Sequence, residues 1–190
     1  MHTCFDLFLV RFLMGFSVMI YRANFSLMLQ EMYEITPKTI GQIMSYGAFV
    51  GFLSGLCTGR IVKFYGNIHK LLLHASVAQL ISIIGLTFAV NIPMLLFFST
   101  VLSINNAVSR VCVTDMSVRR GSGENTGALL GTSQSLTSMA RAIAPFIGGL
   151  AQEVSYRGPG IIGVISGSIG VICIMTYLER DEGSTEQKKE

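Results

Sequence analysis

Long apolar runs separated by short polar segments occupy most of this chain. About 20 apolar residues let a helix cross the hydrocarbon core of a bilayer, where the backbone must satisfy its own hydrogen bonds. The 190 residues therefore hold about six such spans. The sequence predicts an all-α membrane protein, a bundle of six transmembrane helices. We expect the helices at residues 5–30, 39–59, 71–90, 94–114, 125–151 and 160–178, and a disordered charged tail at residues 179–190.

The composition agrees with a membrane protein. Hydrophobic residues make up 51% of the chain and charged residues 13%, against about 25% charged in soluble domains. The net charge of +3 does not indicate a nucleic-acid partner, because the basic residues lie mainly in short loops. The four cysteines have no zinc-site or CxxC spacing, so they are interpreted as packing residues. No metal or cofactor is predicted.

The basic residues are unequally divided between the two ends of the predicted bundle. The end that carries the two termini also holds eight basic residues: Arg60, Lys63, Lys70, Arg119, Arg120, Arg180, Lys188 and Lys189. The loops at the opposite end hold only Lys38 and Arg157. Cytoplasmic loops carry the excess of Lys and Arg in membrane proteins. Both termini are therefore predicted to be cytoplasmic.

The run at residues 125–151 is the most polar of the long runs. At helical spacing one face carries Gly127, Gly131, Gln134, Ser138, Arg141 and Pro145. Lipid cannot satisfy such a stripe. Arg141 lies near the middle of the run, where a charge costs at least ~2.5–3.5 kcal/mol, so it is a candidate functional residue. The alternative is an arginine that snorkels or pairs with a neighbouring helix.

Other polar residues interrupt the first and fourth runs. Arg11 and Arg22 are three turns apart on one helical face, about 16 Å, and Arg22 has Asn24 beside it. Arg11 is near the helix end, which favours snorkelling. The fourth run carries Asn105 and Asn106 close to Arg110.

No Asp or Glu falls inside a predicted span. Arg22 and Arg141 therefore need a counter-charge, which we interpret as an anionic substrate or acids outside this chain. The alternative is that each hydrogen-bonds only Asn, Ser or backbone groups.

Glycines four residues apart mark two of the runs. They are Gly47, Gly51, Gly55 and Gly59 in one, and Gly127 and Gly131 in the other, with a further pair at Gly163 and Gly167. Small residues at this spacing let helices approach closely. We expect these glycines to pack against neighbouring helices.

Two segments resemble the C-terminal half of a major facilitator superfamily transporter, in the drug and proton antiporter branch. The first runs from Gly59 to Lys70 and is similar to the loop motif G-x-L-A-D-R-x-G-R-R. Gly59 and Gly66 match, whereas the motif's Asp and first Arg are replaced by Lys63 and Phe64. The second, SLTSMARAIAPFIGG, is similar to the eleventh helix of that family.

The resemblance implies half of a twelve-helix fold that works by alternating access, with the runs at 71–90 and 160–178 peripheral. On that basis the predicted substrate-binding residues are Arg22, Asn24, Asn105, Asn106, Gln134, Ser138 and Arg141. The predicted loop-motif or gating residues are Gly59, Arg60, Lys63, Gly66, Arg110 and Asp115.

The sequence thus predicts a half-transporter for a small organic solute, and it favours an anion over a cation. Its expected partners are membrane lipid and either the missing six-helix half or a second copy. The alternative is a non-transporting membrane subunit, regulator or truncated isoform that assembles through its glycine seams. An enzyme is not expected, because HExxH, a Walker A loop and a serine–histidine pattern are all missing from the sequence.

Overall fold

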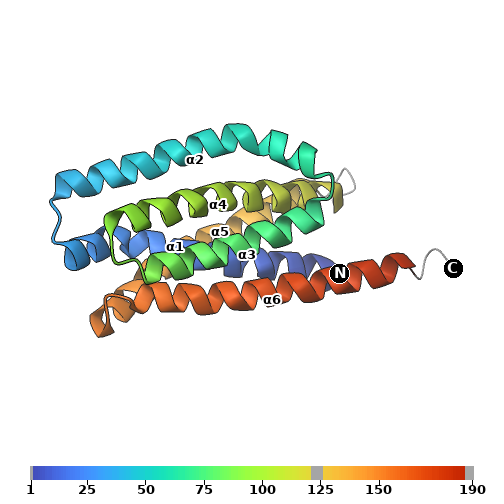
Figure 1. Cartoon of the computed structure of the whole chain (residues 1–190). Helices are drawn as coiled ribbons and strands as arrows, with labels where there is room; N and C mark the ends of the chain where they lie inside the picture. Colours follow the sequence, from blue (N-terminus) through green and yellow to red (C-terminus); the bar gives the residue numbers. More distant parts are fainter. Residues whose placement is uncertain (1, 121–125, 187–190) are drawn as a thin grey trace.

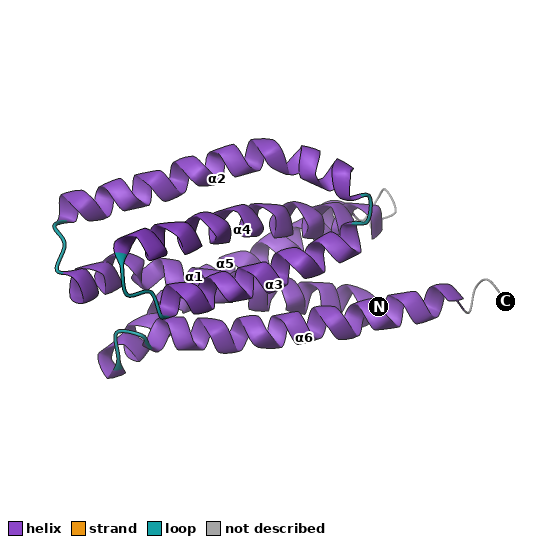
Figure 2. Ribbon diagram, in the orientation of Figure 1, coloured by secondary structure: helices purple, strands orange, loops and turns teal. Residues whose placement is uncertain are grey.

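The computed structural model describes residues 2–120 and 126–186, all within or between six long helices (Figure 1). They are α1 (His2–Tyr33), α2 (Pro37–Tyr65), α3 (Ile68–Thr87), α4 (Ile92–Arg120), α5 (Thr126–Val154) and α6 (Gly158–Glu186). Short loops join the helices whose connections are described (Figure 2). The prediction of an all-α bundle of six helices is confirmed.

The helices run up and down, so α1 begins at the end of the bundle where α6 finishes (Figure 1). α1 packs on α5 and α6, and α3 packs on α4 and α6. Leu29, Ile83, Leu86 and Leu95 are fully buried where α1, α3 and α4 converge. α2 packs mainly on α4 and stands at the margin of the bundle.

Helix ends differ from the predictions because helices continue past their apolar cores. α2 extends to Tyr65, so Arg60 and Lys63 lie on its last turns and only Gly66 and Asn67 form the loop. Gly66 has φ 68°, a conformation that suits glycine, and the Asn67 side chain caps α3 by accepting from the N–H of His69 at 3.1 Å.

α4 and α6 also run further than expected. α4 continues to Arg120, so Asp115 is helical instead of lying in a polar loop. α6 continues to Glu186, through residues 179–186 of the tail predicted to be disordered. Leu178, Glu179 and Arg180 favour helix, which accounts for the continuation. Residues 187–190 lie outside the described part.

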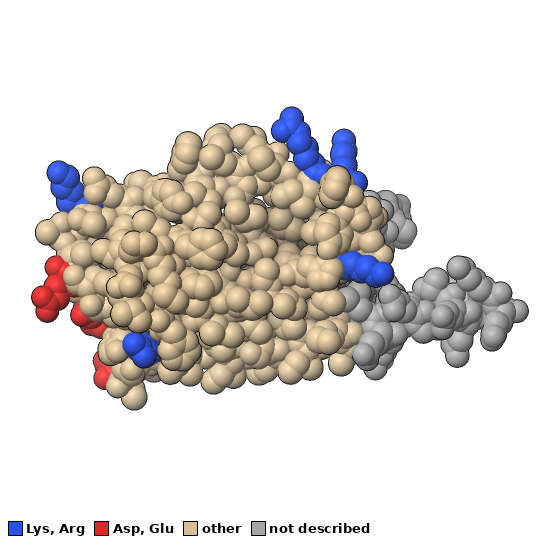
Figure 3. All heavy atoms as spheres, viewed as in Figure 1, with Lys and Arg blue, Asp and Glu red and all other residues tan. Residues whose placement is uncertain are grey.

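Five of the helices in the described part are long and apolar enough to cross a membrane. The spans are Phe8–Tyr33, Pro37–Tyr65, Ile68–Thr87, Ile92–Val118 and Gly158–Thr176. α5 is not among them, because its polar stripe lowers its hydropathy, although it packs along α1 within the bundle. On the face shown in Figure 3, charged side chains gather at the two ends and leave an uncharged belt between them.

The glycines spaced four residues apart differ in how closely a neighbouring helix approaches them. A Cβ on Gly163 would lie 3.1 Å from the Ser17 carbonyl oxygen, and one on Gly167 would lie 3.0 Å from the Ser17 hydroxyl, so α6 approaches α1 closely as expected. A Cβ on Gly51 or Gly55 would meet nothing within 4 Å. The expected close packing is thus not made at these α2 glycines by the described chain, nor at Gly59, Gly127 and Gly131, which are equally open.

Candidate functional site

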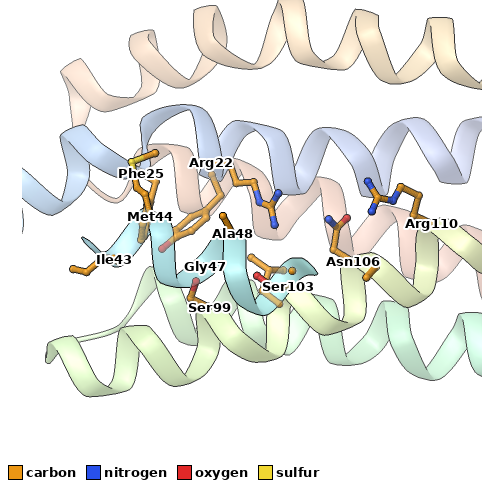
Figure 4. A pocket seen from close by; sticks show the side chains of 14 residues that line it. Arg22, Phe25, Ile43, Met44, Gly47, Ala48, Ser99, Ser103, Asn106 and Arg110 are labelled. Carbon is orange, nitrogen blue, oxygen red and sulfur yellow. The ribbon is translucent and has the colours of Figure 1, made fainter. Parts of the chain in front are cut away.

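A cavity of about 350 Å³ lies between α1, α2 and α4. Within the described chain, α1 packs mainly on α5 and α6, and α4 packs mainly on α3 and α2. α1 and α4 make little contact with each other. The space between α1 and α4 is therefore lined by side chains of these two helices and closed by the facing side of α2 (Figure 4).

One stripe of α4 provides most of the polar lining. Ser99, Ser103, Asn106 and Arg110 follow one another at intervals of four, three and four residues, which places them on one helical face. α2 presents Gly47, Ala48 and Gly51 opposite this stripe. A Cβ on Gly47 would still lie 4.0 Å from the Ser99 hydroxyl oxygen, so the small residues of α2 leave the cavity open.

Two arginines face each other across the polar part of the cavity. Arg22 on α1 and Arg110 on α4 point toward one another, with Asn106 between them (Figure 4). As like charges, the two guanidiniums repel each other. Neither guanidinium donates a hydrogen bond or forms an ion pair within the described part of the chain, and none of the lining residues is Asp or Glu. Each guanidinium has five N–H donors, so a large donor capacity is free for a ligand.

Tyr21 adds a third unused polar group. It lines the cavity and is 4% exposed, and its hydroxyl has no hydrogen-bond partner among the described residues. A buried hydroxyl without a partner costs about 1–3 kcal/mol. A ligand that accepts from Tyr21 would remove that cost.

The opposite part of the cavity is apolar. Phe25 from α1 and Ile43 and Met44 from α2 lie beyond Arg22, away from Arg110 (Figure 4). The cavity therefore has guanidinium groups toward one end and apolar surface at the other, where Tyr21 packs against Phe25 with ring centroids 5.4 Å apart. This arrangement suits a small organic anion.

Two of the predicted substrate-binding residues, Arg22 and Asn106, line this cavity. Asn24 instead donates to the Ile20 carbonyl at 3.1 Å and packs against Gly148 of α5. Asn105 donates to the Val101 carbonyl on its own helix at 2.9 Å. Neither side chain reaches the cavity.

The predicted residues of α5 are also outside the cavity. Gln134, Ser138 and Arg141 are exposed on α5, on a face that the described chain leaves uncovered.

The predicted gating residues are divided. Arg110 lines the cavity, whereas Gly59, Arg60, Lys63 and Gly66 are exposed at the end of α2. Asp115 is half-buried, little more than one turn beyond Arg110 on α4. Gly47 and Gly51, predicted for helix packing, line the cavity instead.

Sequence reasoning missed several lining residues. Ser99 and Ser103 could have been found, because with Asn106 and Arg110 they form a polar stripe at helical spacing. Nothing in the sequence distinguishes Tyr21, Phe25, Ile43 or Met44 from ordinary apolar residues of a spanning helix.

Comparison with known proteins agrees with this architecture. The chain is 27% identical over 179 residues to solute carrier family 22 member 18 of Rattus norvegicus, a match that covers 91% of this chain and 42% of the relative. The protein of the same name from Mus musculus is 26% identical over 157 residues, covering 81% of this chain and 37% of the relative. The chain thus spans about two fifths of the length of these relatives.

The family model described as Major Facilitator Superfamily matches residues 7–190, nearly the whole chain. This multi-pass integral membrane protein therefore belongs to the major facilitator superfamily of membrane transporters.

Proposed function

We propose that this chain is one half of a secondary-active transporter that moves a small organic anion by alternating access. The observation that carries the proposal is the pair of opposed guanidiniums, Arg22 and Arg110, with no acidic residue lining their cavity. Cations within a membrane protein are costly unless they are paired. A carboxylate or similar oxyanion would supply the missing charge and accept bidentate hydrogen bonds from them.

A second group of residues supports the need for a partner. α5 exposes Gln134, Ser138 and Arg141, and a polar face of this kind is not satisfied by lipid. The missing six-helix half, or a second copy of the chain, would cover α5 and the open glycines of α2. Arg141 would then contribute to a central cavity shared between the halves, as in transporters built from repeated units.

The orientation and the branch of the superfamily are part of the same proposal. Arg60, Lys63 and Lys70 lie near the α2–α3 loop, at the end of the bundle where α1 begins, which supports a cytoplasmic location for that end. The Gly59–Lys70 segment and the Pro-Gly pattern of α5 support the drug and proton antiporter branch.

Uptake of labelled organic anions and organic cations by cells expressing the chain tests the proposal. We expect anion uptake above that of control cells, with a loss of at least about tenfold in Arg22→Gln and in Arg110→Gln, because each removes half of the paired site. Arg60→Gln removes the same charge from an exposed position outside the cavity and should transport normally.

Preferential uptake of cations, or anion uptake that neither variant changes, would contradict the proposed substrate class. A chain that forms a complex with a second copy or a six-helix partner but gives no uptake of either class would favour the alternative, a non-transporting subunit. The open glycine face of α2 is the observation that supports that alternative.

A further inference from the structure

Arg11 of α1 contacts a side chain of α5 within the bundle. Its Nε donates to the Thr137 hydroxyl of α5 at 3.4 Å. Thr137 in turn donates to the Ser133 carbonyl at 3.0 Å, so its oxygen lone pairs are available to Arg11. Arg11 therefore has a partner within the bundle, in addition to the snorkelling position expected from its place near the helix end.

Arg11 lies along α1 from the two arginines of the cavity, toward the end of the bundle where α1 begins. Arg11 and Arg22 lie on one face of α1, about 16 Å apart along the helix axis. α4 runs toward the end of the bundle where α1 begins, so Arg110, the last of its lining residues, lies at the end of the cavity nearer Arg11 (Figure 1). Arg11 itself is not among the lining residues.

Most of the N–H groups of Arg11 do not donate a hydrogen bond within the described part of the chain. Nε is the only atom of its guanidinium that donates within the described part of the chain, although an arginine has five N–H groups. Ser133, one turn before Thr137 on the same face of α5, is 2% exposed and its hydroxyl has no partner among the described residues. Two sets of unused donors therefore converge where α1 and α5 meet.

We propose that Arg11, with Arg110, Ser133 and Thr137, forms a second subsite for a compact oxyanion group. This inference rests on the proposed function, because the anion of the Arg22–Arg110 cavity would move to the Arg110–Arg11 subsite on its way through the bundle. Arg110 is shared, so the two subsites are occupied alternately. The second subsite lies nearer the end of the bundle where α1 begins, on the proposed cytoplasmic side.

Because Arg110 is shared, the Arg11 and Arg22 variants should show a specific pattern of sulfate-binding constants. Two alternative subsites add their association constants, so loss of one leaves the other measurable. Arg22→Gln should retain sulfate binding at the second subsite, and Arg11→Gln should retain it at the first. The double variant Arg11→Gln with Arg22→Gln should bind sulfate at least about tenfold more weakly than Arg22→Gln alone.

The experiment is isothermal titration of sodium sulfate into the 190-residue chain in nanodiscs of zwitterionic lipid. The matched control is Arg22→Gln with Arg60→Gln, which has the same net charge as the double variant but keeps Arg11. It should bind like Arg22→Gln alone. Should Arg11→Gln impair folding, as judged by circular dichroism, Arg11→Lys and Thr137→Val in the Arg22→Gln background replace it, and we expect retained and weakened binding respectively.

A double variant that binds as well as Arg22→Gln alone would overturn the second subsite and leave the first intact. A wild-type chain that binds no sulfate would contradict both the subsite and the proposed anion cavity. Full binding in Arg22→Gln that disappears in Arg11→Gln would support Arg11 as an anion site but contradict the cavity proposed for the substrate.

Discussion

Gly51 of α2 determines how much room the proposed anion site has. It lines the cavity, and a Cβ added to it would meet nothing within 4 Å. Gly51→Leu should therefore fill the cavity without straining the fold. We expect anion binding to fall at least about tenfold while the thermal unfolding midpoint is unchanged. Gly55→Leu is the matched control, because Gly55 is equally open but does not line the cavity.

Binding that survives Gly51→Leu at full strength would mean that the anion binds elsewhere in the bundle. A fall in both variants would instead point to a general effect on α2.

Replacing Arg141 should leave sulfate binding unchanged, in contrast to filling the cavity at Gly51. It is exposed on α5 and does not line the cavity of this chain. Arg141→Gln should leave sulfate binding to the isolated chain within about twofold of the wild type. Titration of the variant in nanodiscs checks this. A tenfold loss would show that Arg141 acts on the Arg22–Arg110 cavity without help from a partner half.

The site residues show what a sequence reveals at this scale. Arg22 and Asn106 were predicted because charged and amide side chains are unusual in an apolar helix. Asn24 was predicted because it neighbours Arg22 in sequence, but residues two apart do not share a helical face, and Asn24 lies outside this cavity. Asn105 lies outside the cavity for a similar reason, since only one of two adjacent helical residues can point directly into it.

The contact between α3 and α6 depends on a glycine at its closest point. A Cβ on Gly160 of α6 would lie 2.4, 2.8 and 3.0 Å from Oγ1, Cγ2 and Cβ of Thr87 on α3. Rotation of Thr87 cannot relieve all three contacts. Gly160→Ala should therefore destabilise the chain by about 1–3 kcal/mol, measured as a lower thermal unfolding midpoint in detergent.

Gly149→Ala on α5 provides the comparison, because its Cβ would meet nothing within 4 Å. It should change stability by less than about 1 kcal/mol and in the favourable direction. Equal effects of the two substitutions would contradict the close α3–α6 contact.

Helix positions were easier to predict than helix ends or helix partners. All six apolar runs became helices, but α2, α4 and α6 each continue into polar turns such as Arg60–Lys63. Hydropathy cannot detect these turns, because they extend beyond the apolar stretch. The glycine spacing also did not specify a partner: the α6 pair contacts α1, whereas Gly51 and Gly55 of α2 face open space.

The described residues leave two helices incompletely covered. α2 exposes Phe49, Phe52 and Leu56 along with its open glycines, and α5 exposes its polar face. The relatives are more than twice as long as this chain, which is consistent with a second bundle that covers these helices.

Crosslinking in native membranes followed by mass measurement tests this expectation. We expect the chain in a complex with a second copy or a separate six-helix partner, and a smaller assembled fraction in Gly55→Phe because bulk is added to the free α2 face. Ile165→Phe on α6 serves as the control, since Ile165 is 55% exposed on a helix predicted to be peripheral. An assembled fraction that Gly55→Phe leaves unchanged would exclude this α2 face from the interface.

The central claim is that the cavity between α1, α2 and α4 has a positive potential that selects anions. Asn106 lies between Arg22 and Arg110, so Asn106→Cys places a thiol at the proposed binding point (Figure 4). Cys57 is exposed and would be replaced by serine beforehand. The measurement is the ratio of thiol modification rates for a sulfonate-bearing methanethiosulfonate and its trimethylammonium counterpart.

We predict faster modification by the sulfonate, by at least about tenfold, because two unpaired guanidiniums concentrate anions at this point. The ratio should fall toward that of a free thiol when Arg22 and Arg110 are both replaced by Gln. Faster modification by the cationic reagent, or a ratio that ignores both arginines, would contradict an anion-selective cavity.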